Sequence, residues 1–219
     1  MRLAALVLML QASYVVAQEP AAIKLVIQQA GQQTGSEEFT LRQGRGRGAP
    51  GSTLTAAARY PANNPNIQFA ATLERTADFG LAKFQLDVEG PNGPTVILAA
   101  GTGARLIIRT VGKGSEAGRE LPGGPDVVLL DDGVFSLYSA IADLATPAGK
   151  PLTAVFPRTA RRASFVARRE AGSDGRTRVT LSGDLRGVLV TDGRGQLVRL
   201  ELSDAGIVVT RAPDQTTAQ

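Results

Sequence analysis

Apolar and polar residues alternate with a period of two along most of this chain. The alternation runs through Ile23, Leu25 and Ile27, and it returns in many later stretches on both sides of residue 131. Strict alternation is typical of β-strands that bury one face in a core and leave the other in water. The sequence therefore predicts roughly a dozen strands and a mainly β protein.

Short stretches rich in glycine and asparagine separate these runs. Residues 101–103 lie between two apolar runs and predict a hairpin. Asp192-Gly193 predicts another, because Asp-Gly favours the positive backbone angles of two-residue turns. Residues 113–124 are glycine-rich and lack a clear alternation, so we expect a surface loop there.

One stretch departs from the strand pattern. Residues 127–130 form a short apolar run, as in a strand buried on both faces. The apolar residues that follow are spaced by three and four, which predicts one amphipathic helix over about residues 131–144. We expect Asp131 and Asp132 to cap its start and Pro147 to end it.

A lone helix among many strands must bury its apolar stripe against a sheet. The sequence therefore predicts an antiparallel sheet curled into a half-barrel or open barrel around one central α-helix. No obvious linker divides the chain, so we expect a single β-rich domain over residues 18–212. Residues 213–219 are polar and are expected to form a disordered tail.

Residues 1–17 have the features of a signal peptide. Arg2 supplies the positive start, residues 3–10 the apolar middle and residues 15–17 the small-residue cleavage site. The apolar run is too short to span a bilayer, and no later stretch approaches a membrane span. We therefore expect a periplasmic or extracellular protein with no transmembrane segment after signal cleavage.

The composition narrows the chemistry. The chain contains no histidine and no cysteine, which excludes Ser-His-Asp and Cys-His catalysis and zinc sites built from imidazole or thiolate. Glu37 and Glu38 are neighbours in a predicted strand and should point to opposite faces, so they make a poor acid–base pair. We expect no catalytic residues, no metal and no cofactor, and hence a protein that is not an enzyme.

Charge points to one basic cluster. The net charge of +4 is well below that of a typical nucleic-acid-binding domain, so nucleic acid is not an expected partner. Five arginines cluster after residue 157, where contact with an anionic surface and a solvated strand are both open interpretations. These candidate surface residues are Arg158, Arg161, Arg162, Arg168 and Arg169.

Two stretches support a family resemblance. VVLLDDGVFSLYSAIADL is followed by a proline-flanked strand and then by RVTLSGDLRGVLVTDGRGQLVRLELSDAGIVVTR. This order resembles secreted bacterial β-rich domains of unknown function, which are distantly similar to the half-barrel fold of periplasmic lipoprotein carriers. Because those carriers hold an acyl chain between a curled sheet and a helical lid, the resemblance implies an apolar cleft beside the helix.

Two functions follow as expectations. The first is binding of a lipid or another apolar or amphiphilic ligand in the concave face of the sheet. The second is a structural or protein-interaction role in the cell envelope, with a filled core and an envelope protein as partner. The predicted ligand-binding residues are Phe69, Phe84, Phe135, Tyr138 and Ile141.

Overall fold

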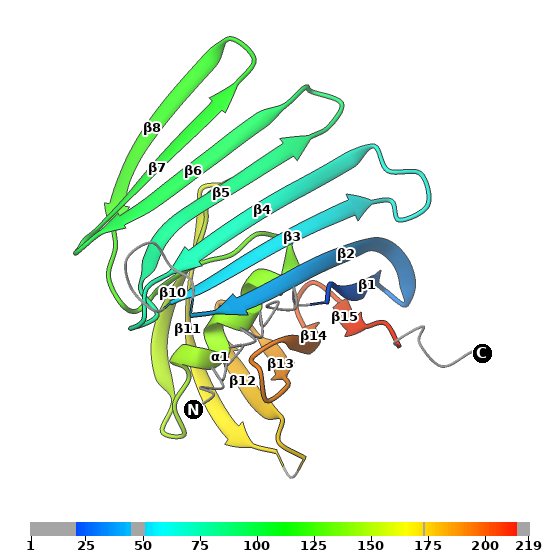
Figure 1. The fold of residues 1–219 in the computed structure, drawn as a ribbon, viewed down its shortest axis with the longest axis vertical. Helices are drawn as coiled ribbons and strands as arrows, with labels where there is room; N and C mark the ends of the chain where they lie inside the picture. Colours follow the sequence, from blue (N-terminus) through cyan, green and yellow to red (C-terminus); the bar gives the residue numbers. More distant parts are fainter. Residues whose placement is uncertain (1–20, 45–50, 173, 214–219) are drawn as a thin grey trace, which may run out of the picture.

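The computed structural model describes residues 21–44, 51–172 and 174–213. Within them the chain forms one 15-stranded sheet that curls around a short helical segment (Figure 1), which confirms the predicted mainly β fold. The predicted signal peptide and most of the predicted tail lie outside the described residues. The strands are β1 (Ile23–Gln29), β2 (Gln32–Gln43), β3 (Ser52–Tyr60), β4 (Ile67–Arg75), β5 (Leu81–Glu89), β6 (Thr95–Thr102), β7 (Arg105–Gly112), β8 (Ser115–Pro122), β9 (Val127–Leu129), β10 (Lys150–Phe156), β11 (Arg161–Ala171), β12 (Thr177–Gly183), β13 (Gly187–Thr191), β14 (Leu197–Leu202) and β15 (Ile207–Arg211).

The strands follow each other through space almost as they do along the chain. The order runs from β8 back to β1, then from β15 back to β9, and β1 pairs with β15 to join the two halves. Every pairing is antiparallel except that of β9 with β10, which is parallel. The two ends of this order, β8 and β9, do not pair with each other. We call the break between them the seam.

Residues 123–126, which we call the linker, cross the seam at one end. The amide of Gly123 donates to the carbonyl oxygen of Ala104 in the β6–β7 turn at 2.8 Å. The carbonyl oxygen of Asp126 accepts a hydrogen bond from Thr153 of β10 at 2.9 Å. The linker therefore ties the two ends of the sheet together here, while β7 and β8 project away from the helix at the other end (Figure 1).

Residues 113–124 were predicted as a loop, but most of them form β8. Nearly every side chain of β8 is exposed, so the strand lacks the alternation by which buried strands are recognised. Its backbone pairs with β7 from Arg105 opposite Pro122 to Gly112 opposite Ser115. Sequence periodicity reports burial, and it therefore misses a strand that is held mainly by backbone hydrogen bonds and exposed ion pairs to its neighbour.

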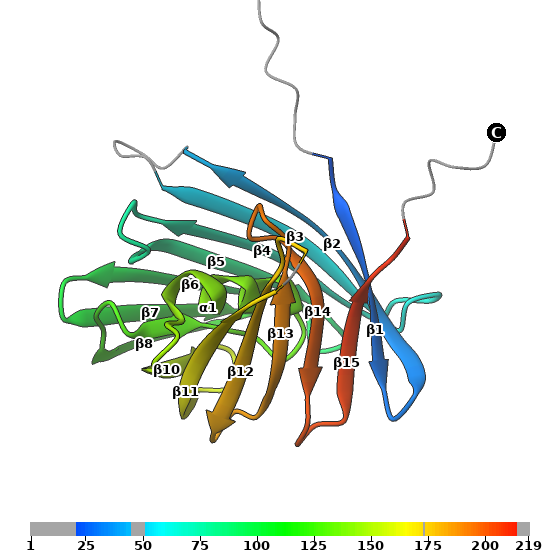
Figure 2. The same ribbon diagram turned by 90° about the horizontal axis from the view of Figure 1, so that it is seen from below.

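The central helix is shorter than predicted. It consists of a 3-10 turn, η1 (Phe135–Tyr138), that continues into α1 (Ser139–Leu144), and neither has a side-chain cap. Asp131 and Asp132 therefore do not cap it as predicted, because the chain between residues 131 and 134 is not helical. We call the segment 131–145 the plug, because the curled sheet surrounds α1 (Figure 2).

The core lies between the concave face of the sheet and the plug. Inward-facing residues of both sheet halves form one apolar cluster with the plug, in which Leu137 and Ile141 are fully buried. α1 packs against β11, β12 and β13, while η1 packs against β2 and β14. No helix in the described part of the chain is long and apolar enough to cross a membrane.

Candidate functional site

A buried carboxylate of β2 holds the start of the plug. The two carboxylate oxygens of Glu37 accept hydrogen bonds from the amides of Phe135, at 2.7 Å, and Ser136, at 3.0 Å. These amides are among the free donors of a helix start, so Glu37 does the capping that was expected of Asp131 and Asp132. Burial raises the pKa of Glu37 to about 7, although the nearby Ser136 side chain and the two amide hydrogen bonds lower it.

Tyr60 of β3 reaches the same end of the plug. Its hydroxyl donates to the carbonyl oxygen of Gly133 at 2.9 Å, and its ring meets the ring of Phe69 edge-on. A Cβ at position 133 would lie 2.7 Å from the Phe69 ring, so glycine is required for the plug to approach the sheet this closely. Glycine is also required at Gly35, where a Cβ would collide with the Tyr60 ring.

Asp131 joins this end of the plug to the second half of the sheet. Its carboxylate accepts two hydrogen bonds from Arg158, at 2.9 and 3.0 Å, and one from the amide of Gly133 at 2.7 Å. The Arg158 guanidinium lies over the Phe69 ring, 5.2 Å from its centroid. Asp131 is only 1% exposed, so its charge depends on these partners for compensation.

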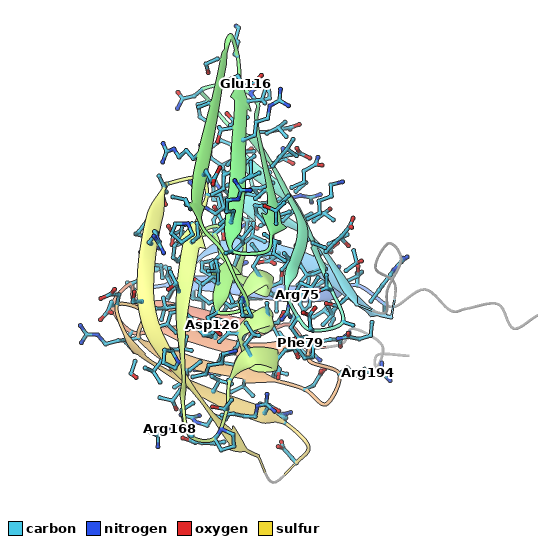
Figure 3. The ribbon with its side chains drawn as sticks, turned by 90° about the vertical axis from the view of Figure 1, so that its left-hand side faces the viewer. Arg75, Phe79, Glu116, Asp126, Arg168 and Arg194 are labelled. Atoms are coloured by element: carbon cyan, nitrogen blue, oxygen red, sulfur yellow. The ribbon has the colours of Figure 1, made fainter. Side chains whose placement is uncertain are left out.

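Arginines hold the other end of the plug. Arg75, the last residue of β4, contacts Asp143 of α1 with a nitrogen–oxygen distance of 2.7 Å. The Nε atom of Arg75 donates to the carbonyl oxygen of Phe79, and its guanidinium stacks 5.1 Å from the Phe79 ring centroid. From β11, Arg169 donates to the carbonyl oxygen of Ala142 at 3.0 Å. Figure 3 shows Arg75 and Phe79 beside α1, with Asp126 on its other side in that view.

Buried polar atoms without a hydrogen-bond partner lie on the plug and on the arginines that hold it. Among the described residues, the buried side-chain atoms without a hydrogen-bond partner lie on η1 or on the two arginines that hold α1. Leaving a buried polar atom unpaired costs about 1–3 kcal/mol. Imperfect matching is therefore concentrated at the surface where the plug meets the sheet. The atoms are Arg75 Nη2, Ser136 Oγ, Tyr138 Oη and Arg169 Nε.

A hollow of about 430 Å³ lies at the seam, beside the loop that follows β4. Residues 76–80 form what we call the rim loop, and its Thr76, Asp78 and Gly80 line the hollow together with the β6–β7 turn and the linker across the seam. Its volume falls in the range of small-molecule sites. Because Arg75 immediately precedes the rim loop, the hollow is adjacent to the C-terminal attachment of the plug.

The structure places the predicted ligand-binding residues in the core. Their exposed fractions range from 0% for Phe84, Tyr138 and Ile141 to 6% for Phe69. Phe135 and Tyr138 contact each other with ring centroids 6.0 Å apart, and Phe69 covers Gly133. In the state that the structure describes, these side chains therefore pack with the plug inside the sheet, and their role in ligand binding stays a prediction.

The five arginines predicted as a cluster lie on two faces of the sheet. Arg158 and Arg161 pair with Asp131 and Asp132, and Arg169 donates to the plug. Arg162 and Arg168 are exposed, and their even-numbered positions place them on the opposite face of β11 from Arg161 and Arg169. Three of the five arginines therefore contact the plug, and two face solvent.

Glu37, Tyr60 and Arg75 were not singled out as site residues from the sequence. Glu37 stands two residues before Phe39 in β2, so strand alternation places it on the inward face with an apolar neighbour. An inward charge in an otherwise apolar row was a usable signal. No comparable signal pointed to Phe135 and Ser136 as the partners of Glu37, because they lie 98 and 99 residues away along the chain.

Comparison with known proteins supports the fold and assigns no function. No family model and no curated protein matches the chain. The structure is similar to that of a β-barrel-like protein of the domain of unknown function DUF1849 from Brucella abortus, with a TM-score of 0.50, 10% identity and coverage of 87% of this chain and 92% of that one. A DUF1089 family protein from Pseudomonas aeruginosa is 12% identical over 87% of this chain and 95% of that one, with a TM-score of 0.43. The first likeness shows a β-barrel-like domain of unknown function, as expected, and the link to lipoprotein carriers stays a prediction.

Proposed function

We propose that this protein is an exported, non-enzymatic binding protein that takes up an apolar or amphiphilic ligand against the concave face of its sheet. In this proposal the plug occupies the ligand's place and moves aside when the ligand binds. The observation that carries the proposal is the position of the unpartnered buried atoms, which lie on η1 or on the arginines that hold α1.

Those unpartnered atoms lower the free energy that is needed to release the plug from the sheet. The concave face is lined by large apolar side chains such as Leu25, Phe39 and Leu73. Exposing it to water is unfavourable, so either the plug or a ligand must cover it. The plug covers it, but the unmatched polar atoms and the burial of the Glu37 and Asp131 carboxyl groups reduce the net stabilisation. A ligand that binds only the open state then shifts the population by its affinity for that state.

The non-enzymatic and exported parts of the proposal rest on the sequence. A chain without histidine or cysteine lacks the usual acid–base and nucleophilic groups. Glu37 is already engaged with amides of the plug, and Asp131 with Arg158. Export rests on residues 1–17. Fusing them to a reporter enzyme that is active only outside the cytoplasm tests export, and an inactive fusion overturns it.

Titration with a fluorescent hexadecanoic acid tests the binding proposal. Arg75→Gln removes the ion pair with Asp143, which weakens the attachment of α1 and raises the fraction of open protein. If that attachment contributes about 1 kcal/mol, the apparent affinity rises about fivefold. Arg109→Gln is the matched control, because it removes an exposed ion pair with Glu116 on β7 and β8.

A second control separates opening of the plug from general loss of stability. Val209→Ala in β15 creates a cavity in the core without removing a polar contact of the plug. We expect it to lower stability without raising the affinity for the fatty acid. The binding proposal is wrong if neither the wild type nor Arg75→Gln takes up the probe, or if Val209→Ala tightens binding as much as Arg75→Gln does.

The second candidate function is an envelope interaction domain with a permanently filled core. The burial of all five predicted ligand-binding side chains favours it, since none is more than 6% exposed. This function requires that the plug stay closed, so it is supported by the absence of probe uptake in both the wild type and Arg75→Gln.

A further inference from the structure

The hollow at the seam has an apolar interior and a charged rim. Leu106 is fully buried and Leu81 and Val127 are half-buried, whereas Asp78 and Arg105 are exposed. Sites for amphiphilic small molecules combine apolar walls with a few polar groups that fix orientation. This division of the lining suits a molecule with an apolar part inside and a polar part at the surface.

Glycines keep the walls of the hollow bare. Gly103 and Gly124 have φ angles of +62° and +130°, and a Cβ added to either would meet no atom within 4 Å. At Gly101 and Gly123 an added Cβ would lie 2.7 Å from the Leu81 carbonyl oxygen and 2.6 Å from the Arg105 carbonyl carbon. Gly103 and Gly124 therefore border open space, whereas Gly101 and Gly123 allow the neighbouring backbone to come close.

The rim carries one charge of each sign. Asp78 accepts a hydrogen bond from the Thr76 hydroxyl, which lowers the pKa of Asp78 and favours its anionic form. Arg105 lies 3.5 Å from Glu120, and both side chains are more than half exposed. An exposed pair of this kind is weak, so a ligand anion can compete with Glu120 for Arg105.

We propose that the seam hollow binds the head group of a single-chain amphiphile whose head carries both a positive and a negative charge. The head cation faces Asp78, the head anion faces Arg105, and the apolar chain begins beside Leu81 and Leu106. This inference rests on the proposed function and deepens it by naming the class of head group and the place where it enters.

The rim loop links this hollow to the plug. Thr76, Asp78 and Gly80 line the hollow, while the carbonyl oxygen of Phe79 in the same loop accepts a hydrogen bond from Arg75 at 3.2 Å. Arg75 in turn holds Asp143 of α1. A head group bound to Asp78 therefore contacts the same loop whose Phe79 carbonyl oxygen positions Arg75, and Arg75 holds the C-terminal end of the plug.

Binding of two probes of equal chain length tests the head-group class. One is a fluorescent lysophospholipid with a phosphoethanolamine head, and the other is the fluorescent fatty acid. We expect Asp78→Asn and Arg105→Gln each to weaken lysophospholipid binding about two- to fivefold. Asp78→Asn should leave fatty-acid binding unchanged or tighter, because it removes a negative charge near the carboxylate, and Arg109→Gln should alter neither probe.

Photo-crosslinking locates the head group. A lysophospholipid with a diazirine next to its phosphate is bound to the full-length protein, irradiated and mapped by peptide mass spectrometry. Labels within residues 76–81, 103–106 or 123–127 support the inference. Labels elsewhere, unchanged affinity in both rim variants, or binding of the fatty acid alone overturn it and leave the proposed function standing. If neither probe binds even to Arg75→Gln, the proposed function fails and the inference fails with it.

Discussion

At its N-terminal end the plug offers backbone amides to carboxylates, whereas at its C-terminal end it offers carbonyl oxygens and one carboxylate to arginines. Glu37 and Asp131 accept from the amides of residues 133, 135 and 136. Arg75 and Arg169 donate to the side chain of Asp143 and the carbonyl oxygen of Ala142. Each arrangement suits the partial charge at that end of a helical segment.

The two ends differ more in burial than in the number of bonds. Glu37 and Asp131 are each 1% exposed, whereas the side chain of Asp143 is 29% exposed. Arg75 and Arg169 also each leave one buried nitrogen without a partner. A fully buried carboxylate must keep its partners, whereas water stabilises the partly exposed Asp143 after separation. Arg75 is only 7% exposed, but it keeps the carbonyl oxygen of Phe79 as a partner. We therefore expect the N-terminal end to stay fixed while the C-terminal end opens.

The largest expected effect comes from removing the partner of the buried Asp131. Arg158→Met keeps an apolar stem over Phe69 but leaves the Asp131 carboxylate without its guanidinium. We expect the free energy of unfolding, measured in urea at neutral pH, to fall by about 3–5 kcal/mol. Arg109→Met, which breaks an exposed two-bond pair with Glu116, should cost about 1 kcal/mol or less. Equal losses in the two variants would contradict the expectation that burial of Asp131 makes its ion pair more important for stability than an exposed pair.

The second effect is a pH dependence that Glu37 contributes. Its pKa is raised from 4.5 to about 7 in the folded state, so the folded protein keeps a proton that the unfolded chain releases. This contribution to stability is complete below about pH 4.5 and is lost as the pH rises towards 7, by about 3 kcal/mol in total. Other carboxyl groups also make the stability depend on pH, so the contribution of Glu37 must be measured by comparison with a variant that lacks this carboxyl group.

Glu37→Gln isolates this contribution because glutamine has nearly the same shape and does not titrate. We expect the urea-unfolding free energy of the wild type to fall relative to that of Glu37→Gln between pH 5 and 7. Glu38→Gln is the control, since Glu38 is the exposed neighbour on the opposite face of β2. If the wild type and Glu37→Gln show the same slope in this range, Glu37 does not carry the raised pKa.

Hydrogen exchange compares the two ends directly. The amide of Ala145 donates to the carbonyl oxygen of Ile141 at the C-terminal end, and the amide of Phe135 donates to Glu37 at the N-terminal end. We expect Ala145 to be less protected by about tenfold, equivalent to about 1.4 kcal/mol of opening free energy. Arg75→Gln should widen this difference. Equal protection at both ends would show that the plug moves as one body or stays closed.

The sequence predicted the elements that bury side chains and missed contacts that depend on register. Alternation identified strands such as β1, β4 and β5, and the three-and-four spacing located the central helix. The start of that helix was misplaced because Asp131 pairs with Arg158, 27 residues away, instead of capping. Glu37 likewise meets the plug only because β2 lies where η1 packs, and a single sequence contains no measure of such a distance.

The candidate site was harder to predict than the fold for the same reason. Aromatic residues near the helix indicated where apolar contacts lie, and all of them do belong to the core. The charged residues that hold the plug come from four places: β2, β4, β11 and the turn between β10 and β11. These places converge only when the sheet curls. Five of the twelve residues that line the seam hollow are glycines, which leave no side-chain pattern to recognise.

The smallest expected effect compares two buried tyrosines that differ in one hydrogen bond. Tyr60 donates to the carbonyl oxygen of Gly133, whereas the hydroxyl of Tyr138 has no partner. Tyr60→Phe should therefore lower the unfolding free energy by about 1 kcal/mol, and Tyr138→Phe should leave it unchanged or raise it, because it removes an unpaired buried oxygen. Urea unfolding of both variants at one pH measures the difference. A loss in Tyr138→Phe equal to that in Tyr60→Phe would mean that the Tyr138 hydroxyl is satisfied in solution, and the count of unmatched groups that supports an opening plug would then be too high.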